Sequence, residues 1–164
     1  RRRRIYIIGF LNKNIHEFYY PAPKLKKLFT VKNFLDKNVD CSFTISNKLW
    51  KGHIKRKKRN IKNGKGFGFK LTKSNDLCTN TISSRYYKDG SECLIDQGKD
   101  KNPRKLTPKE CFRLQGFPEN FKISGSKIES YKQAGNSVPI NVVEAICFRM
   151  IDYLINNKNK KKVA

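Results

Sequence analysis

Residues 104–118 read RKLTPKECFRLQGFP, and they decide the fold of the last third of the chain. Thr107 and Glu110 have the spacing of a capping box, and Pro108 stands at the first helical position. Gly116 follows as a stop signal. The stretch therefore predicts a short helix with both ends marked by its own residues.

Two further helices are predicted beyond this stretch. Ser126 and Glu129 repeat the capping box, and Gly135 is expected to stop that helix. A third helix is expected to start near Pro139 and to dissolve into Asn156–Lys162. Its apolar face is broad and has to dock on another surface. That face consists of Val142, Val143, Ile146, Met150, Ile151, Leu154 and Ile155.

A strongly basic helix is predicted upstream. Ser46 is a candidate N-cap for a helix that runs to about Ile61, and Asn63-Gly64 is its stop signal. Residues 41–75 contain no acidic side chain, so a surface that faces a polyanion should be concentrated there. Because this helix cannot form a wide apolar face, it is expected to lie on the surface with Trp50 as its anchor.

The residues that follow predict a loop and three strands. Gly64–Phe69 lacks the strand-turn-helix context of a nucleotide-binding loop, so it predicts a hinge or a surface-hugging loop. Its aromatic side chains either pack inward or stack on bases. Strand-like runs lie at Phe67–Thr72, Cys78–Tyr86 and Glu92–Ile95, and Lys88-Asp89-Gly90 predicts a hairpin between the last two.

The composition excludes several classes of protein. The chain has 164 residues, of which 37% are hydrophobic, and a formal charge of +24 at pH 7. A real core is expected, and nucleic acid is favoured as the partner over an anionic membrane surface. Five cysteines without a C-x-x-C pair predict neither a disulfide framework nor a zinc site and favour a reducing cytosolic setting. No stretch is long enough to span a bilayer, and the first residue, Arg1, predicts a piece of a longer product.

Four stretches of the sequence carry a resemblance to a known family. Residues 104–118 and residues 131–139, which read YKQAGNSVP, strongly resemble the last two sequence blocks of DNA (cytosine-5)-methyltransferases. Arg2-Arg3-Arg4 and the apolar residues behind it are similar to the family's arginine-bearing block, in which a strand follows. Thr79–Gly90 resembles the target recognition domains of bacterial restriction-modification methyltransferases, with Thr81-Ile82 as their pair of threonine and aliphatic residue.

The resemblance implies an α/β fold: the C-terminal fragment of an S-adenosylmethionine-dependent methyltransferase fold with a small mixed α+β target recognition domain. It implies the end of a catalytic domain at 1–20, the recognition domain at 21–103 and returning catalytic-domain helices at 104–164. The family's Phe-x-Gly-x-Gly cofactor loop, Pro-Cys nucleophile and Glu-Asn-Val acid are absent from the sequence. We therefore expect the chain to bind duplex DNA but to transfer no methyl group alone.

The resemblance also implies catalytic and cofactor residues. Arg4 takes the position of the arginine that hydrogen-bonds cytosine O2, and Arg2 braces the same site or a phosphate. Without the resemblance, four consecutive arginines are typical of a solvated basic end. Asn136, Ser137 and Val138 are expected to close over the amino-acid end of S-adenosylmethionine, which the missing N-terminal part would mainly bind. The alternative is an ordinary turn between helices, and no metal site is expected.

DNA contacts are expected from two segments. The basic helix is expected to contact DNA phosphates, and the segment around Thr81 is expected to contact base edges. In that segment, Arg85 is the candidate for base reading. Arg85 alternatively bonds Asp89 or a phosphate. The predicted DNA-binding residues are Lys55, Arg56, Lys58, Arg59, Lys62, Thr81, Ile82 and Arg85. Structural roles that hold the recognition domain in place are expected for Arg104, Thr107, Glu110 and Arg113.

The implied partners are double-stranded DNA and the missing N-terminal catalytic portion or subunit, with a cognate restriction endonuclease in the same system. The implied location is the bacterial cytoplasm, near the nucleoid, with no membrane partner. Three arrangements fit: a truncated full enzyme, a subunit of a split enzyme, or an inactive remnant. The alternative class is a non-catalytic basic nucleic-acid-binding protein, which accounts for the charge but not for the blocks at 104–118 and 131–139.

Overall fold

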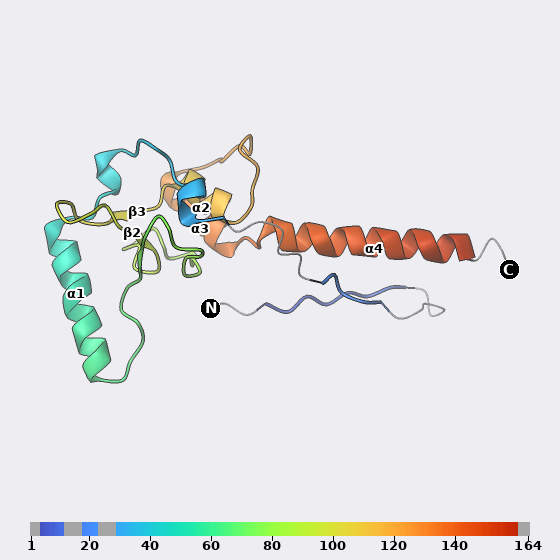
Figure 1. The fold of residues 1–164 in the computed structure, drawn as a ribbon, viewed down its shortest axis with the longest axis horizontal. Helices are drawn as coiled ribbons and strands as arrows, with labels where there is room; N and C mark the ends of the chain where they lie inside the picture. Colours follow the sequence, from blue (N-terminus) through green and yellow to red (C-terminus); the bar gives the residue numbers. More distant parts are fainter. Residues whose placement is uncertain (1–3, 12–17, 23–28, 161–164) are drawn as a thin grey trace. The chain divides into compact units, whose positions relative to one another are not determined.

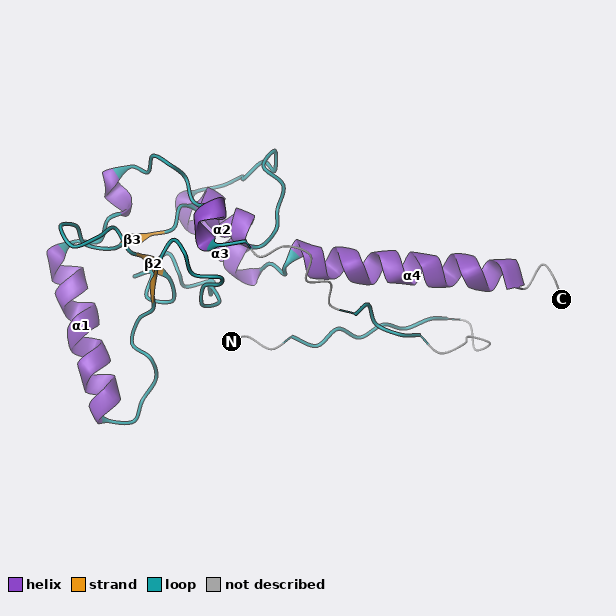
Figure 2. Ribbon diagram, in the orientation of Figure 1, coloured by secondary structure: helices purple, strands orange, loops and turns teal. Residues whose placement is uncertain are grey.

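The computed structural model describes residues 4–11, 18–22 and 29–160, which form two compact units (Figure 1, Figure 2). One unit holds residues 29–137, and the other holds residues 4–11, 18–22 and 138–160. The elements of the first unit are η1 (Val31–Phe34), η2 (Cys41–Phe43), α1 (Asn47–Lys62), β1 (Leu71–Thr72), β2 (Leu94–Ile95), β3 (Arg104–Lys105), α2 (Pro108–Leu114) and α3 (Lys127–Asn136). The second unit contains α4 (Ile140–Lys160).

The helix boundaries follow the capping residues. Ser46 accepts a hydrogen bond from the Leu49 amide at the start of α1, and complete capping boxes open α2 and α3. Gly116 has a φ of 85°, the left-handed conformation expected of a residue that closes a helix. These predictions are confirmed, whereas the stop predicted at Gly135 is wrong because α3 continues to Asn136 and Ser137 is its C-cap.

The strand predictions are only partly correct. β1 pairs with β2 in parallel and β2 pairs with β3 antiparallel, so one small sheet has the order β1-β2-β3. No strand forms over Cys78–Tyr86, and the predicted hairpin is absent from this described segment. The backbone there makes local turns instead: the Tyr86 amide donates to the Ser83 carbonyl at 3.1 Å, and the Gly90 amide donates to the Tyr86 carbonyl at 3.1 Å.

The core of the first unit explains why this segment is not a strand. Tyr86 is fully buried, and its ring packs edge-on against Tyr131 of α3 with centroids 5.4 Å apart. Its hydroxyl donates to the Cys93 carbonyl at 2.6 Å and accepts from the Leu106 amide at 2.8 Å. A buried hydroxyl needs such partners, and they hold Tyr86 in a turn. The other buried members of this cluster are Val31, Ile82, Cys93, Ile95, Leu106, Cys111, Phe112 and Ala134.

A buried ion pair fixes α2. Glu110 accepts from both terminal nitrogens of Arg104 at 2.8 Å, and its oxygens also accept the amides of Asp36 and Thr107. Arg113 bonds Asp36 at 2.6 Å and Glu119 through two hydrogen bonds. These contacts tie the segment after η1 to α2 and confirm Thr107 and Glu110 as structural caps, while the role of holding a recognition domain in place stays a prediction. Packing therefore places residues 104–137 in one unit with residues 29–103, while the functional boundaries at 20/21 and 103/104 stay predictions.

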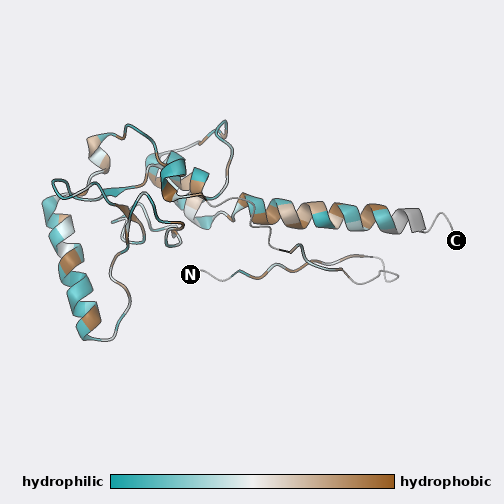
Figure 3. Ribbon diagram, viewed as in Figure 1, coloured by the Kyte–Doolittle hydropathy of each residue, from teal (hydrophilic) through white to brown (hydrophobic). Residues whose placement is uncertain are grey.

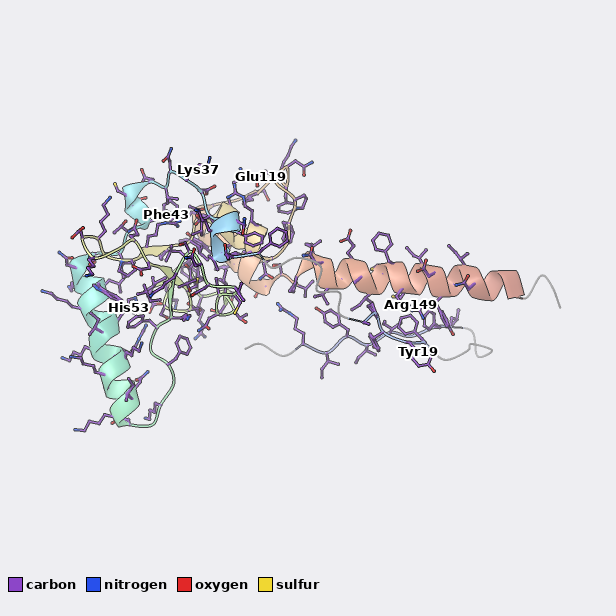
Figure 4. All side chains as sticks on the ribbon, viewed as in Figure 1. Tyr19, Lys37, Phe43, His53, Glu119 and Arg149 are labelled. Atoms are coloured by element: carbon purple, nitrogen blue, oxygen red, sulfur yellow. The ribbon has the colours of Figure 1, made fainter. Side chains whose placement is uncertain are left out.

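The second unit is built around aromatic side chains. Tyr153 of α4 packs against Phe10 and Phe18, with centroids 4.9 and 5.4 Å apart. Arg149 donates to the Tyr19 carbonyl at 3.2 Å (Figure 4). The helix continues to Lys160 instead of dissolving from Asn156, and its apolar and polar residues alternate along its length (Figure 3). Among the described residues, we find no helix with the length and apolar character needed to cross a membrane.

Candidate nucleic-acid and cofactor site

The outer face of α1 is a continuous basic stripe. Residues three and four positions apart share one face of a helix, and five lysines of this 16-residue helix have that spacing. All five are exposed, and Arg59 is exposed beside them. Most residues along the helix are hydrophilic, with a few apolar residues between them (Figure 3). The stripe consists of Lys48, Lys51, Lys55, Lys58 and Lys62.

The inner face of α1 packs on the small sheet. Trp50 meets Phe69 edge-on with centroids 4.9 Å apart, which confirms Trp50 as an anchor. His53, labelled in Figure 4, is the fully buried residue of the helix, and burial lowers its pKa. Lys57 lies with its ammonium 4.7 Å from the centre of the Phe69 ring. His53 and Lys57 therefore lie on the face of α1 that meets Phe69, and not on the outer stripe.

Arg56 is also turned inward. Its guanidinium donates to the Asp89 carboxylate at 2.9 Å and to the Gly68 carbonyl at 3.0 Å. It also lies 2.8 Å from Nδ1 of His53, so Nδ1 accepts and Nε2 donates to the Asp89 carbonyl at 3.2 Å. Asp89 therefore bonds Arg56, and not Arg85 as one alternative had it. The Arg56 guanidinium thus joins three segments: helix α1, the loop at Gly68 and the turn at Asp89.

The segment predicted to read bases is mounted on the core. Ile82 is buried, whereas Thr81 and Arg85 are exposed. The Ser83 hydroxyl donates to Glu92 at 2.5 Å and accepts the Arg85 amide at 3.1 Å. Of the predicted pair, only Thr81 presents its side chain to a ligand, and Ile82 anchors the segment from below.

The C-terminal end of α3 packs closely against the backbone of Ser83 and Ser84, which belong to this segment. A Cβ at Gly135 would lie 2.5 Å from the Ser84 amide nitrogen and closer still to the Ser83 carbonyl group. Only glycine allows two backbones to approach so closely. The structure therefore brings the predicted base-reading segment against the predicted cofactor turn, which begins at the next residue.

Gly135→Ala is expected to destabilise the chain by about 1–3 kcal/mol, because the obstructing atoms belong to backbone and cannot rotate away. Gly52→Ala is the matched control: it also lies inside a helix, nothing lies within 4 Å of its Cβ position, and the change should stabilise by about 0.5–1 kcal/mol. Urea unfolding of both variants measures the difference. Equal midpoints would show that the contact with Ser83 is not tight.

Part of the turn that is predicted to contact the cofactor, residues 136–138, is engaged in hydrogen bonds within the protein. The Ser137 amide donates to the Gln133 carbonyl at 2.9 Å, and its hydroxyl donates to the Ala134 carbonyl at 2.7 Å. Both of these Ser137 protons therefore serve the end of α3. Asn136 and Val138 are exposed. The Asn136 amide, which is both donor and acceptor, is the side chain of this turn that fits the ammonium and carboxylate of an amino acid.

The N-terminal candidates are only partly described. Arg4 is half-buried, and Arg2 lies outside the described residues. Ile5 and Ile7 are 88% and 90% exposed, and the strand expected here has no sheet partner among residues 4–11, 18–22 and 29–160. Within the same ranges, no group of three or more metal-ligating side chains occurs.

Two parts of this arrangement were missed by sequence reasoning. Arg56 stands three residues after His53, so helical spacing placed it on the inner face, although its charge favoured an outer position. Gly135 was read as a stop, yet a glycine before the end of a capped helix also signals a close backbone approach. Both signals were present in the sequence.

Comparisons with known proteins identify the family. The family model for C-5 cytosine-specific DNA methylases matches residues 1–152. The chain is 52% identical over 160 residues to the Type II methyltransferase M1.ScrFI of Lactococcus lactis subsp. cremoris, covering 96% of this chain and 41% of the relative. It is 47% identical over 163 residues to the Type II methyltransferase M.DsaV of Dactylococcopsis salina, covering 99% and 46%. The chain thus spans less than half the length of these relatives.

Solved structures agree on the fold. The S. pombe Dnmt2 methyltransferase superposes with a TM-score of 0.63 at 17% identity, over 80% of this chain and 44% of that one. The Entamoeba histolytica methyltransferase EhMeth superposes with a TM-score of 0.61 at 23% identity, over 90% and 46%. The α/β methyltransferase fold expected from the sequence is thereby supported in its coarse form. The chain belongs to the C-5 cytosine-specific DNA methylase family.

Proposed function

We propose that this chain is the DNA-recognising, C-terminal portion of a DNA (cytosine-5)-methyltransferase of a restriction-modification system. The observation that carries the proposal is the contact between Gly135 and Ser83, because it joins the segment expected to read bases to the turn expected to hold the cofactor. A basic protein that only coats nucleic acid has no need of that contact. A split-enzyme subunit and an inactive remnant remain outcomes of the test below.

The chemistry of the family assigns a role to Arg4. Carbon 5 of cytosine is too electron-poor to attack a methyl donor, so a thiolate first adds at C6 and negative charge develops on the ring. A permanent charge at O2 stabilises that ring in the transition state. Arg4 supplies this charge in our proposal, and Arg2 braces the same site.

The thiolate itself is proposed to come from the N-terminal portion that the relatives possess. Burial raises the pKa of Cys93 to about 11 and holds that of Cys111 well above its usual range. Both thiols therefore stay protonated near neutral pH, and neither is a nucleophile. None of the five cysteines follows a proline.

S-adenosylmethionine is proposed as the methyl donor, and it supplies the methyl group when bound. Asn136 would contact its amino-acid end, with Ser137 and Val138 shaping the turn. The exposed amide of Asn136 supports this assignment. Most of the cofactor surface is assigned to the N-terminal portion.

Duplex DNA is the proposed substrate. The target base has to leave the stack at a cost of a few kcal/mol, which contacts elsewhere must offset. Phosphate contacts are assigned to Lys55, Lys58, Arg59 and Lys62, and base contacts to Thr81 and Arg85. Arg56 and Ile82 act by holding these segments in place, because their side chains are engaged inside the unit.

The salt dependence of DNA binding should resolve these roles. Replacing Lys55, Lys58 or Lys62 singly by glutamine is expected to lower the log-log salt slope by about 0.9. Lys37→Gln is the control, because Lys37 is exposed but lies outside α1 (Figure 4). Arg56→Gln should instead lower the melting temperature, because three internal hydrogen bonds are lost. Fluorescence anisotropy from 50 to 300 mM salt measures the slopes; a slope unchanged in all three lysine variants contradicts the assignment.

A chimera tests the function directly. In the Lactococcus lactis relative, the matching 160 residues are replaced by this chain, and labelled methyl transfer to cytosine in duplex DNA is measured. We expect transfer by the chimera, and DNA binding without transfer by the chain alone. An inert chimera that still binds DNA identifies a remnant. A chain that binds no duplex DNA overturns the proposal.

A further inference from the structure

The two phenylalanines of the loop after α1 have opposite surroundings. Phe69 is 9% exposed and packs against Trp50, so it belongs to the second core cluster. Phe67 is 54% exposed, and no aromatic partner is found for it in the described part of the chain. The sequence leaves open whether these aromatics pack inward or stack on bases; the structure packs Phe69 inward and leaves Phe67 exposed.

The loop is held firmly against α1. The Lys65 amide donates to the Asn60 carbonyl at 2.8 Å, and the Gly68 carbonyl accepts from Arg56 at 3.0 Å. Gly68 has a φ of 78°, and a Cβ there would lie 2.7 Å from the Cα atom of Lys57. Glycine is thus required at this position, and the loop is fixed on both sides of Phe67. A fixed loop presents its exposed ring without an entropic cost of ordering on binding.

The charges around this loop favour a polyanion. Lys62 ends the basic stripe of α1, Lys65 is exposed two residues before Phe67, and no acidic side chain occurs in residues 41–75. Arg56, which holds Gly68, also holds Asp89, so the loop is linked to the turn that follows Arg85. In residues 41–75 the exposed large apolar side chains are Ile61 and Phe67, too few for the contiguous patch that an apolar protein partner needs. An exposed ring among lysines suits nucleic acid, where phosphates flank bases that can be unstacked.

We propose that Phe67 stacks on a base face that the bound duplex exposes when the target base leaves the stack, while Arg56 positions its loop beside the basic stripe. This inference rests on the proposed function, since it requires a DNA partner. It adds a contact that carries no charge and tolerates any base, because every base has a π-face. Arg56 is a positioning residue in this account, and Phe67 touches the DNA.

The test compares four variants of the full chain on one duplex by fluorescence anisotropy. Phe67→Ala is expected to raise Kd by about 5- to 100-fold, with an unchanged salt slope and melting temperature. Phe67→Trp should bind as the native chain does, whereas Phe67→Leu should resemble the alanine variant, because leucine is apolar but cannot stack. Phe148→Ala is the matched control, since Phe148 of α4 is 61% exposed.

The outcomes separate this inference from the proposed function. A native chain that binds no duplex DNA rejects the proposed function and, with it, this inference. A native chain that binds while Phe67→Ala binds equally well rejects stacking alone. Equal affinities of the leucine and native chains also reject stacking, because burial of any apolar group would then suffice. A changed salt slope in Phe67→Ala would show that the loop had lost its structure.

Discussion

Glu110→Ala is expected to lower the free energy of unfolding by about 3–5 kcal/mol, a large share of the 5–15 kcal/mol typical of a domain. The Glu110 carboxylate is fully buried and accepts four hydrogen bonds, two of them from Arg104. Removing it leaves a guanidinium and the amides of Asp36 and Thr107 without partners. A buried charge without a partner is among the most destabilising defects known in proteins.

The chain contains its own control for this prediction. Glu129 occupies the same position in the capping box of α3, but its side chain is on the surface. Glu129→Ala therefore loses the cap without leaving a buried charge, and its effect on unfolding should be much smaller. The double change Arg104→Met with Glu110→Leu should recover part of the loss, because the ion pair is then removed as a whole. Urea unfolding followed by circular dichroism measures all three; similar losses for the two glutamates would contradict a buried role for Glu110.

The helix boundaries of this fold could be predicted from the sequence because they are set by neighbouring residues. Thr107 and Glu110, or Ser126 and Glu129, satisfy the first amides of a helix within one turn of chain. The sheet could not be predicted in the same way. β1 and β2 are two residues long and pair in parallel across more than twenty residues, so no turn sequence specifies them. Tyr86 looked like a strand residue because its buried partners, Leu106 and Tyr131, come later in the chain.

In the candidate site, too, features set by neighbouring residues could be predicted, and features set by contacts between distant residues could not. The basic stripe of α1 could be predicted from charge and spacing, since helical periodicity is a local property. The contact of Gly135 with Ser83, in contrast, joins residues that are 52 positions apart, so no local pattern predicts it. Charge alone also favours an outward Arg56, because its ion pair with Asp89 depends on a turn for which the sequence predicts a hairpin. Local signals therefore predict the basic helix, and packing determines which of its side chains are held against the rest of the unit.

In the chimera with the Lactococcus lactis relative, Arg4→Ala is expected to lower kcat for methyl transfer by about 100- to 1,000-fold, the usual effect of losing one donor to a developing oxyanion. Affinity for duplex DNA should stay unchanged, because the donor acts on the ring after it has bound. Single-turnover measurement with labelled methyl donor gives the rate, and anisotropy gives Kd.

The competing interpretation makes the opposite prediction. If Arg4 is only part of a solvated basic end, its loss removes one positive charge, so Kd should rise with a salt slope lower by about 0.9 while the rate at saturating DNA stays the same. Arg4→Lys separates the two further. Lysine retains the charge but not the rigid fork of donors, so it should restore binding in the electrostatic case and leave most of the rate defect in the catalytic one. A full rate in Arg4→Lys together with a salt-dependent Kd in Arg4→Ala would remove Arg4 from the reaction and leave the oxygen at C2 to a residue of the N-terminal portion.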